Sequence, residues 1–88
     1  MAVHEMSVAM EVCRIVEARV PSEQVQRVVT VGLDVGDDSG VEPDSLRFWL
    51  ESLLSNPPFG SARPAIERVA GDALRVSYLE VDDGDQDD

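Results

Sequence analysis

The segment VQRVVTVGLDVG, residues 25–36, decides the fold class of this chain. Val29, Val31, Leu33 and Val35 alternate in it with a mixed set, Val28, Thr30, Gly32 and Asp34. Period-two alternation rich in β-branched side chains predicts a β-strand. One face of this strand is wholly apolar and the other is mixed, so we expect a sheet that is covered on one side.

A helix is predicted before this strand, from about Glu5 to Val20. Its apolar residues recur at steps of three and four, which is typical of one buried helix face. Pro21 ends the helix because the residue before a proline is pushed out of the α region. The predicted apolar face consists of Met6, Ala9, Met10, Cys13, Val16 and Val20.

A second helix is predicted after the strand, with Ser45 to about Ser55 as its body and Pro43 in its first turn. Proline suits that position because a first-turn N–H has no partner within the helix. Glu42 and Asp44 favour the same, positively polarised end. Its apolar face is formed by Leu46, Trp49, Leu50, Leu53 and Leu54.

Two short strands complete the predicted fold, Ala65–Val69 and Ala73–Val81, the second with Leu74, Val76 and Tyr78 on one face. Gly71-Asp72 between them is typical of a tight hairpin turn. The order helix, strand, helix, strand, strand predicts an α+β fold class, a small three-stranded sheet with two helices packed on one face.

Composition and charge limit the classes of partner that the chain can bind. The chain has 88 residues and a net charge of −11, with only seven basic residues, which are scattered. Because nucleic acids and anionic membranes are bound by clustered Lys and Arg, we exclude both as partners. No apolar run approaches the roughly 20 residues that span a bilayer, and no secretory leader is recognised, so we expect a cytoplasmic protein.

Cysteine and histidine each occur once. A single Cys13 excludes an intrachain disulfide and a cysteine-rich zinc site, and we interpret it as a core residue. His4 leaves two readings open. It is either a polar residue at a helix end or a nitrogen ligand for Ni²⁺ or Cu²⁺. Removal of Met1 would give an Ala-Val-His start, whose amine, two amide nitrogens and imidazole form a square-planar set. Intact mass decides whether Met1 is retained.

Three stretches of the chain resemble the HypA/HybF family of hydrogenase nickel-incorporation proteins. They are HEMSVAMEVCRIVEARV, QRVVTVGLDVGDDSGVEPDSLRFWLESL and AIERV, within residues 4 to 81. The family opens with His-Glu-Met-Ser and carries Ser-Gly-Val-Glu-Pro before a Leu-x-Phe helix. Those motifs are residues 4–7, residues 39–43 and Leu46-Arg47-Phe48 here.

The resemblance implies a nickel metallochaperone and not an enzyme. His4 would hold Ni²⁺ with adjacent backbone nitrogens, and Glu5 would support the site. The implied partners are a GTPase hydrogenase-maturation factor and the precursor of the nickel–iron hydrogenase large subunit. An enzyme is also not expected because no nucleophile–base pair accompanies His4.

The chain departs from the family in two places. Ala2-Val3 separate the histidine from Met1, and the family's zinc module with two Cys-x-x-Cys pairs is missing. We therefore expect a nickel-binding domain over 1–81, with a hairpin near 70–72 in place of the zinc module, and a disordered acidic tail over 82–88. Zinc is not predicted. A metal-free docking module of the hydrogenase maturation machinery is the alternative function.

Overall fold

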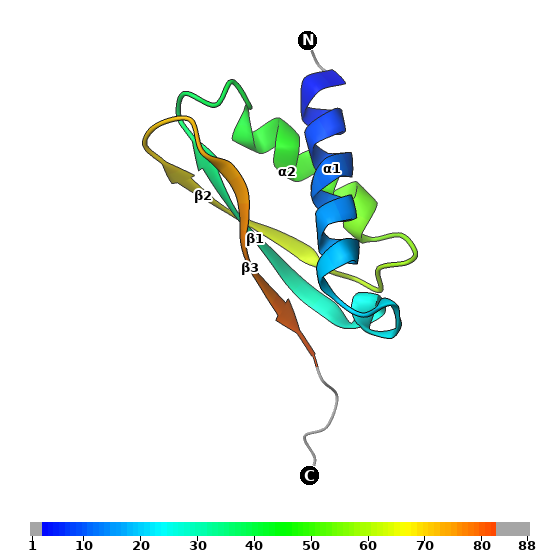
Figure 1. The fold of residues 1–88 in the computed structure, drawn as a ribbon. Helices are drawn as coiled ribbons and strands as arrows, with labels where there is room; N and C mark the ends of the chain where they lie inside the picture. Colours follow the sequence, from blue (N-terminus) through cyan, green and yellow to red (C-terminus); the bar gives the residue numbers. More distant parts are fainter. Residues whose placement is uncertain (1–2, 83–88) are drawn as a thin grey trace.

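A computed structural model describes residues 3–82. The elements follow the predicted order (Figure 1), with a short 3₁₀ helix, η1, where the strand was expected to begin. The proposed tail beyond residue 82 lies outside the described residues. The elements are α1 (Val3–Arg19), η1 (Ser22–Arg27), β1 (Val28–Gly36), α2 (Pro43–Leu54), β2 (Arg63–Val69) and β3 (Leu74–Val81).

The sheet has the order β2-β1-β3, with β1 parallel to β2 and antiparallel to β3. The predicted hairpin near 70–72 is therefore wrong, because β2 and β3 flank β1 instead of pairing with each other. The link between them crosses the end of β1. There the N–H of Gly36 donates to the carbonyl of Ala73 at 2.6 Å, and the N–H of Asp37 donates to that of Val69 at 2.8 Å. As the most continuously apolar strand, β1 takes the central position.

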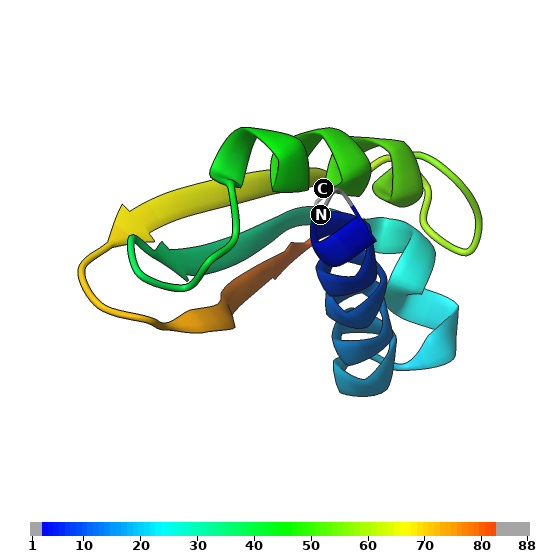
Figure 2. The same ribbon diagram turned by 90° about the horizontal axis from the view of Figure 1, so that it is seen from above.

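Both helices cover the same face of the sheet, so the predicted α+β class is confirmed (Figures 1 and 2). Val31, Leu33 and Val35 project from β1 into a single core between the sheet and the helices. Burial of such side chains provides the main favourable free energy of folding. The fully buried contribution of α2 to this core consists of Leu46, Leu50 and Leu54.

On α1 and β1, two residues assigned to apolar faces in the sequence are in fact exposed. Met10 is 52% exposed, whereas Val12 is buried beside Cys13 on α1. Val29 is 43% exposed, and Val28 takes the buried position. A shift of the β1–β3 register between Val28 and Thr30 explains the second difference, since it breaks strict alternation at the start of the strand.

Contrary to the sequence prediction, Tyr78 does not share a face with Leu74 and Val76. Gly32 pairs with Tyr78 but Leu33 pairs with Val76, so Ser77 is an extra residue in β3. An extra residue is the mark of a β-bulge, and it changes which face the following side chain occupies. Val76 is buried in the core, whereas Tyr78 lies over Gly32 on the face of the sheet away from the helices.

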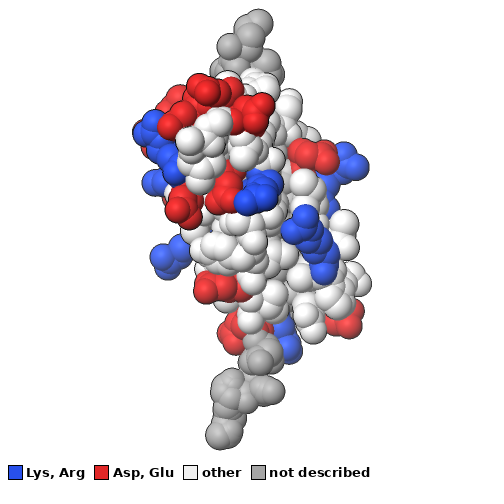
Figure 3. All heavy atoms as spheres, turned by 60° about the vertical axis from the view of Figure 1, so that its left-hand side comes forward, with Lys and Arg blue, Asp and Glu red and all other residues white. Residues whose placement is uncertain are grey.

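Charged side chains of both signs share the surface that lies to the left in Figure 1, and acidic ones gather at its upper end (Figure 3). Two ion pairs are Arg75–Asp34 at 3.1 Å and Arg68–Asp37 at 3.4 Å. Within residues 3–82, no helix combines the length and apolar character needed to cross a membrane.

Candidate metal centre

His4 lies in the first turn of α1 and its side chain is exposed. Backbone N–H groups in a first helical turn have no acceptor within the helix. An imidazole at this position therefore has main-chain nitrogen nearby and solvent on its open side. Imidazole and main-chain nitrogen are the ligand types that Ni²⁺ and Cu²⁺ accept in a square-planar arrangement.

Glu5 is oriented differently from His4. It is a buried charged residue, only 9% exposed. Its Oε2 accepts a hydrogen bond from the backbone N–H of Glu42 at 3.0 Å. Because consecutive helical residues are about 100° apart around the axis, the two side chains leave α1 in different directions. The structure therefore brings Glu5 to the start of α2 and does not pair it with His4.

Glu42 is the N-cap of α2. Its side chain accepts a hydrogen bond from the N–H of Ser45 at 2.8 Å. This bond, followed by one from the backbone of Asp44, lowers the pKa of the Glu42 carboxyl group below its usual 4.5. A negative charge also suits the positive end of the helix. Glu42 thus fixes the first turn of α2 through its carboxylate and donates its own N–H to Glu5 of α1.

The link between β1 and α2 is further ordered by a short local bond. The N–H of Val41 donates to Oγ of Ser39 at 3.2 Å, and Val41 is itself buried. This bond orders the loop that leads to Glu42, and the bond from the N–H of Glu42 to Glu5 joins the start of α2 to the start of α1. Sequence reasoning recognised Glu42 as part of a helix start but missed its bond with Glu5. No local pattern marks a contact between residues 37 positions apart.

The described residues contain no group of three or more His, Cys, Asp or Glu side chains placed to hold a metal ion. Cys13 is buried, and burial, followed by the charge of Glu17, raises the pKa of its thiol to about 11. A thiol with this pKa is a poor metal ligand at neutral pH because the thiolate is the coordinating form. Neither His4 nor Glu5 has a described side-chain cluster around it to complete a coordination sphere.

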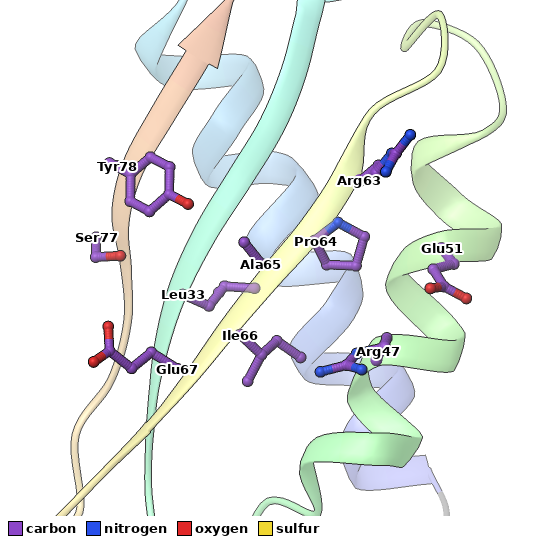
Figure 4. Close-up of a pocket in the computed structure, with 10 residues that line it drawn as sticks. All are labelled: Leu33, Arg47, Glu51, Arg63, Pro64, Ala65, Ile66, Glu67, Ser77 and Tyr78. Carbon is purple, nitrogen blue, oxygen red and sulfur yellow. The ribbon is translucent and has the colours of Figure 1, made fainter.

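A hollow of about 500 Å³ lies at β2 (Figure 4). Arg47 and Glu51 of α2 lie on one side of this strand in the view, and Ser77 and Tyr78 of β3 lie on the other. These side chains do not converge on a common point, and neither His4 nor Glu5 lines the hollow. It is therefore separate from the candidate metal centre at the start of α1.

Comparison with known proteins assigns the family. The sequence model described as "Hydrogenase/urease nickel incorporation, metallochaperone, hypA" matches residues 3–80. The chain belongs to the HypA family. This match confirms the resemblance found in the sequence, and the family it describes is one of metallochaperones that act in nickel incorporation.

Curated relatives carry the name "Hydrogenase maturation factor HypA". The protein of Geobacter metallireducens is 41% identical over 68 residues, which are 77% of this chain and 59% of that protein. The protein of Geobacter sulfurreducens is 37% identical over the same shares. That of Polaromonas naphthalenivorans is 37% identical over 70 residues, 80% of this chain and 61% of that protein. This HypA-family chain thus spans about three fifths of the length of these relatives.

Proposed function

We propose that this chain is a nickel-binding accessory protein for maturation of nickel–iron hydrogenase. His4 is the side-chain ligand, and main-chain nitrogens near it complete the donor set. Glu5 supports the site as the neighbouring residue. The observation that carries the proposal is the exposed imidazole in the first turn of α1, in a chain whose family is described by nickel incorporation.

The contact between Glu5 and Glu42 supports this arrangement. Metal sites depend on neighbouring hydrogen bonds that orient their ligands. Here the residue next to His4 is tied to the cap of α2 at 3.0 Å. The first turn of α1 is therefore restrained at Glu5, the residue next to the proposed ligand. This restraint lowers the conformational entropy that is lost when a metal orders the turn.

Two forms of the site follow from the sequence. In a chain that begins at Ala2, the amine, two amide nitrogens and the His4 imidazole provide four nitrogen ligands. In a chain that retains Met1, the amine lies one residue further from His4, so it cannot complete the same chelate. Each donor competes with a proton, so binding weakens at low pH in both forms.

The proposed role is delivery and not catalysis. The partners we propose are a GTPase hydrogenase-maturation factor and the large-subunit precursor of nickel–iron hydrogenase, in the cytoplasm. The family description and the names of the relatives support a place in this maturation machinery. Zinc has no proposed part, since the sequence contains one cysteine.

The test is calorimetric titration of Ni²⁺ into the full chain and into His4→Ala, with Ser7→Ala as the matched control on the exposed side of α1. We expect His4→Ala to lose binding and Ser7→Ala to retain it. Preparations beginning at Met1 and at Ala2, verified by intact mass, are titrated in parallel. Tighter binding and a square-planar absorption band are expected for the Ala2 form. Equal affinity of His4→Ala and the unaltered chain would reject the proposal.

A metal-free docking module remains the second candidate. One observation favours it, namely that the Glu5 carboxylate is already engaged by the N–H of Glu42 and is buried. In this case Glu5 and Glu42 serve only to join the helices. The Ala2 form would then show no absorption band on titration with Ni²⁺, while still binding the GTPase or the hydrogenase precursor.

A further inference from the structure

The outer edge of β3 is the feature that points beyond nickel binding. Within residues 3–82 the sheet ends at β3, whose one neighbouring strand is β1. The strand is eight residues long, Leu74–Val81. An edge of this length presents a row of backbone donors and acceptors that can pair with another strand.

We propose that β3 pairs antiparallel with β3 of a second copy of this chain, which joins two three-stranded sheets into one of six strands. The sequence LRVSYLEV reads in a self-complementary way about a two-fold axis between Ser77 and Tyr78. Arg75 then lies opposite Glu80 of the second copy, and by symmetry the same ion pair forms twice.

The side chains that meet also share a face. Arg75 pairs with Asp34 and Glu80 with Thr30 in the β1–β3 ladder, which puts both on the face away from the helices. Residues five positions apart on a regular strand lie on opposite faces. The extra residue Ser77 shifts the alternation by one, so Arg75 and Glu80 lie on the same face. Directly opposed ions of opposite charge on one face stabilise an antiparallel pair, and like charges destabilise it.

Arg75 has the capacity for both contacts. Its Nε donates to Oδ2 of Asp34 at 3.1 Å, and its side chain is still 72% exposed. A guanidinium group presents five N–H donors, so the outer nitrogens can bond a second carboxylate. Glu80 is exposed. The intramolecular pair with Asp34 therefore orients the Arg75 side chain and leaves its outer nitrogens available to Glu80 of the second copy.

The helix-covered face offers matching apolar contacts. The same register places Leu74 opposite Val81 and Val76 opposite Leu79 of the second copy. Leu74 is 38% exposed and borders an apolar hollow of about 130 Å³ between α1 and β3, lined also by Val8 and Val12. The second copy's Val81 would cover this exposed leucine and remove apolar surface from water.

Two features determine how strongly two copies are expected to associate. Charged residues on an edge strand usually discourage pairing, and the chain carries a net charge of −11. Here the order of the charges makes one register attractive, while the net charge opposes association over a longer range. Added salt screens long-range repulsion more than a short ion pair at the interface. We therefore expect weak association that strengthens on moving from low to physiological salt.

Sedimentation measurements over a range of concentrations test the inference on the full chain. We expect a reversible equilibrium between the 9.6 kDa monomer and a species of twice that mass. Glu80→Arg should weaken association by at least about tenfold, because two ion pairs become two like-charge contacts. Arg75→Glu should do the same, and an equimolar mixture of the two variants should associate as heterodimers.

Glu67→Arg is the matched control, with the same charge change on β2 at the opposite edge of the sheet. It should associate at least as well as the unaltered chain. Concentration-dependent protection of β3 amides from hydrogen exchange provides a measurement that needs no variant. An unaltered chain that stays monomeric at about 1 mM, or a Glu67→Arg variant weakened as much as Glu80→Arg, would overturn the inference. Neither outcome bears on nickel binding.

Discussion

Glu5 and Glu42, at the amino-terminal ends of the two helices, are joined by a 3.0 Å hydrogen bond from the backbone N–H of Glu42 to the carboxylate of Glu5. The acceptor is 9% exposed. Hydrogen bonds to a buried charged group contribute more to stability than neutral ones. This bond therefore ties the start of α1, next to the proposed nickel ligand, to the capped start of α2.

Glu5→Ala should lower the free energy of unfolding by about 1–3 kcal/mol, because it leaves the Glu42 N–H without its acceptor. Glu5→Gln should cost less, since its amide oxygen can still accept the bond. Urea denaturation followed by circular dichroism measures both. Glu11→Ala is the control, because Glu11 is exposed and pairs with Arg14 on the surface, where an ion pair contributes about 0–1 kcal/mol. Similar destabilisation by Glu5→Ala and Glu11→Ala would contradict the structural role of the bond.

Glu42 should contribute to the pH dependence of stability. Hydrogen bonds from the backbone N–H groups of Ser45 and Asp44 lower its pKa in the folded chain below 4.5. Its contribution is therefore present above the pKa of the unfolded chain and is lost as the pH falls through the folded pKa. Glu42→Gln should lose less stability than the unaltered chain between neutral and acidic pH. The urea midpoints of both proteins across this range provide the measurement, and identical curves would be evidence against it.

The thiol of Cys13 should be unreactive in the folded chain. It is 8% exposed, and burial, with a smaller effect from Glu17, raises its pKa to about 11. Since the thiolate is the reactive form, alkylation at neutral pH should follow transient unfolding and be slow without denaturant. Mass spectrometry after timed exposure to iodoacetamide, with and without urea, reports this. Labelling at the rate of a small free thiol in native buffer would show that the site is open.

Much of the fold could be predicted from local pattern. The apolar periodicity of residues 46–54 and the alternation of residues 31–35 place α2 and β1 where they are found. Each of these segments has enough apolar positions on one face for its period to be read unambiguously. The order of the elements and the α+β class followed directly.

What could not be predicted depends on contacts between distant segments. The pairing of β1 with both β2 and β3 is set by competition for the centre of the sheet, and Gly71-Asp72 suits a turn in either arrangement. The aliphatic residues of LRVSYLEV change phase, from Leu74 and Val76 to Leu79 and Val81, but Tyr78 continues the first alternation and so conceals the bulge at Ser77. For the site, the sequence singled out His4 and Glu5, but the 37-residue separation hid the bond to Glu42. The part of His4 and Glu5 in metal binding stays a prediction.

Gly32 and Tyr78 should be energetically coupled. The ring of Tyr78 occupies the space where a Cβ at position 32 would lie. An aromatic side chain over a strand glycine covers backbone that would otherwise face water. Gly32→Ala should therefore displace the ring and destabilise the fold, and Tyr78→Ala should destabilise it by removing the cover. In the double variant the new methyl group meets no ring, so the two effects should fall short of additivity by about 0.5–3 kcal/mol. Unfolding free energies of the four proteins give this coupling directly. Strict additivity would mean that Tyr78 lies away from Gly32 in solution.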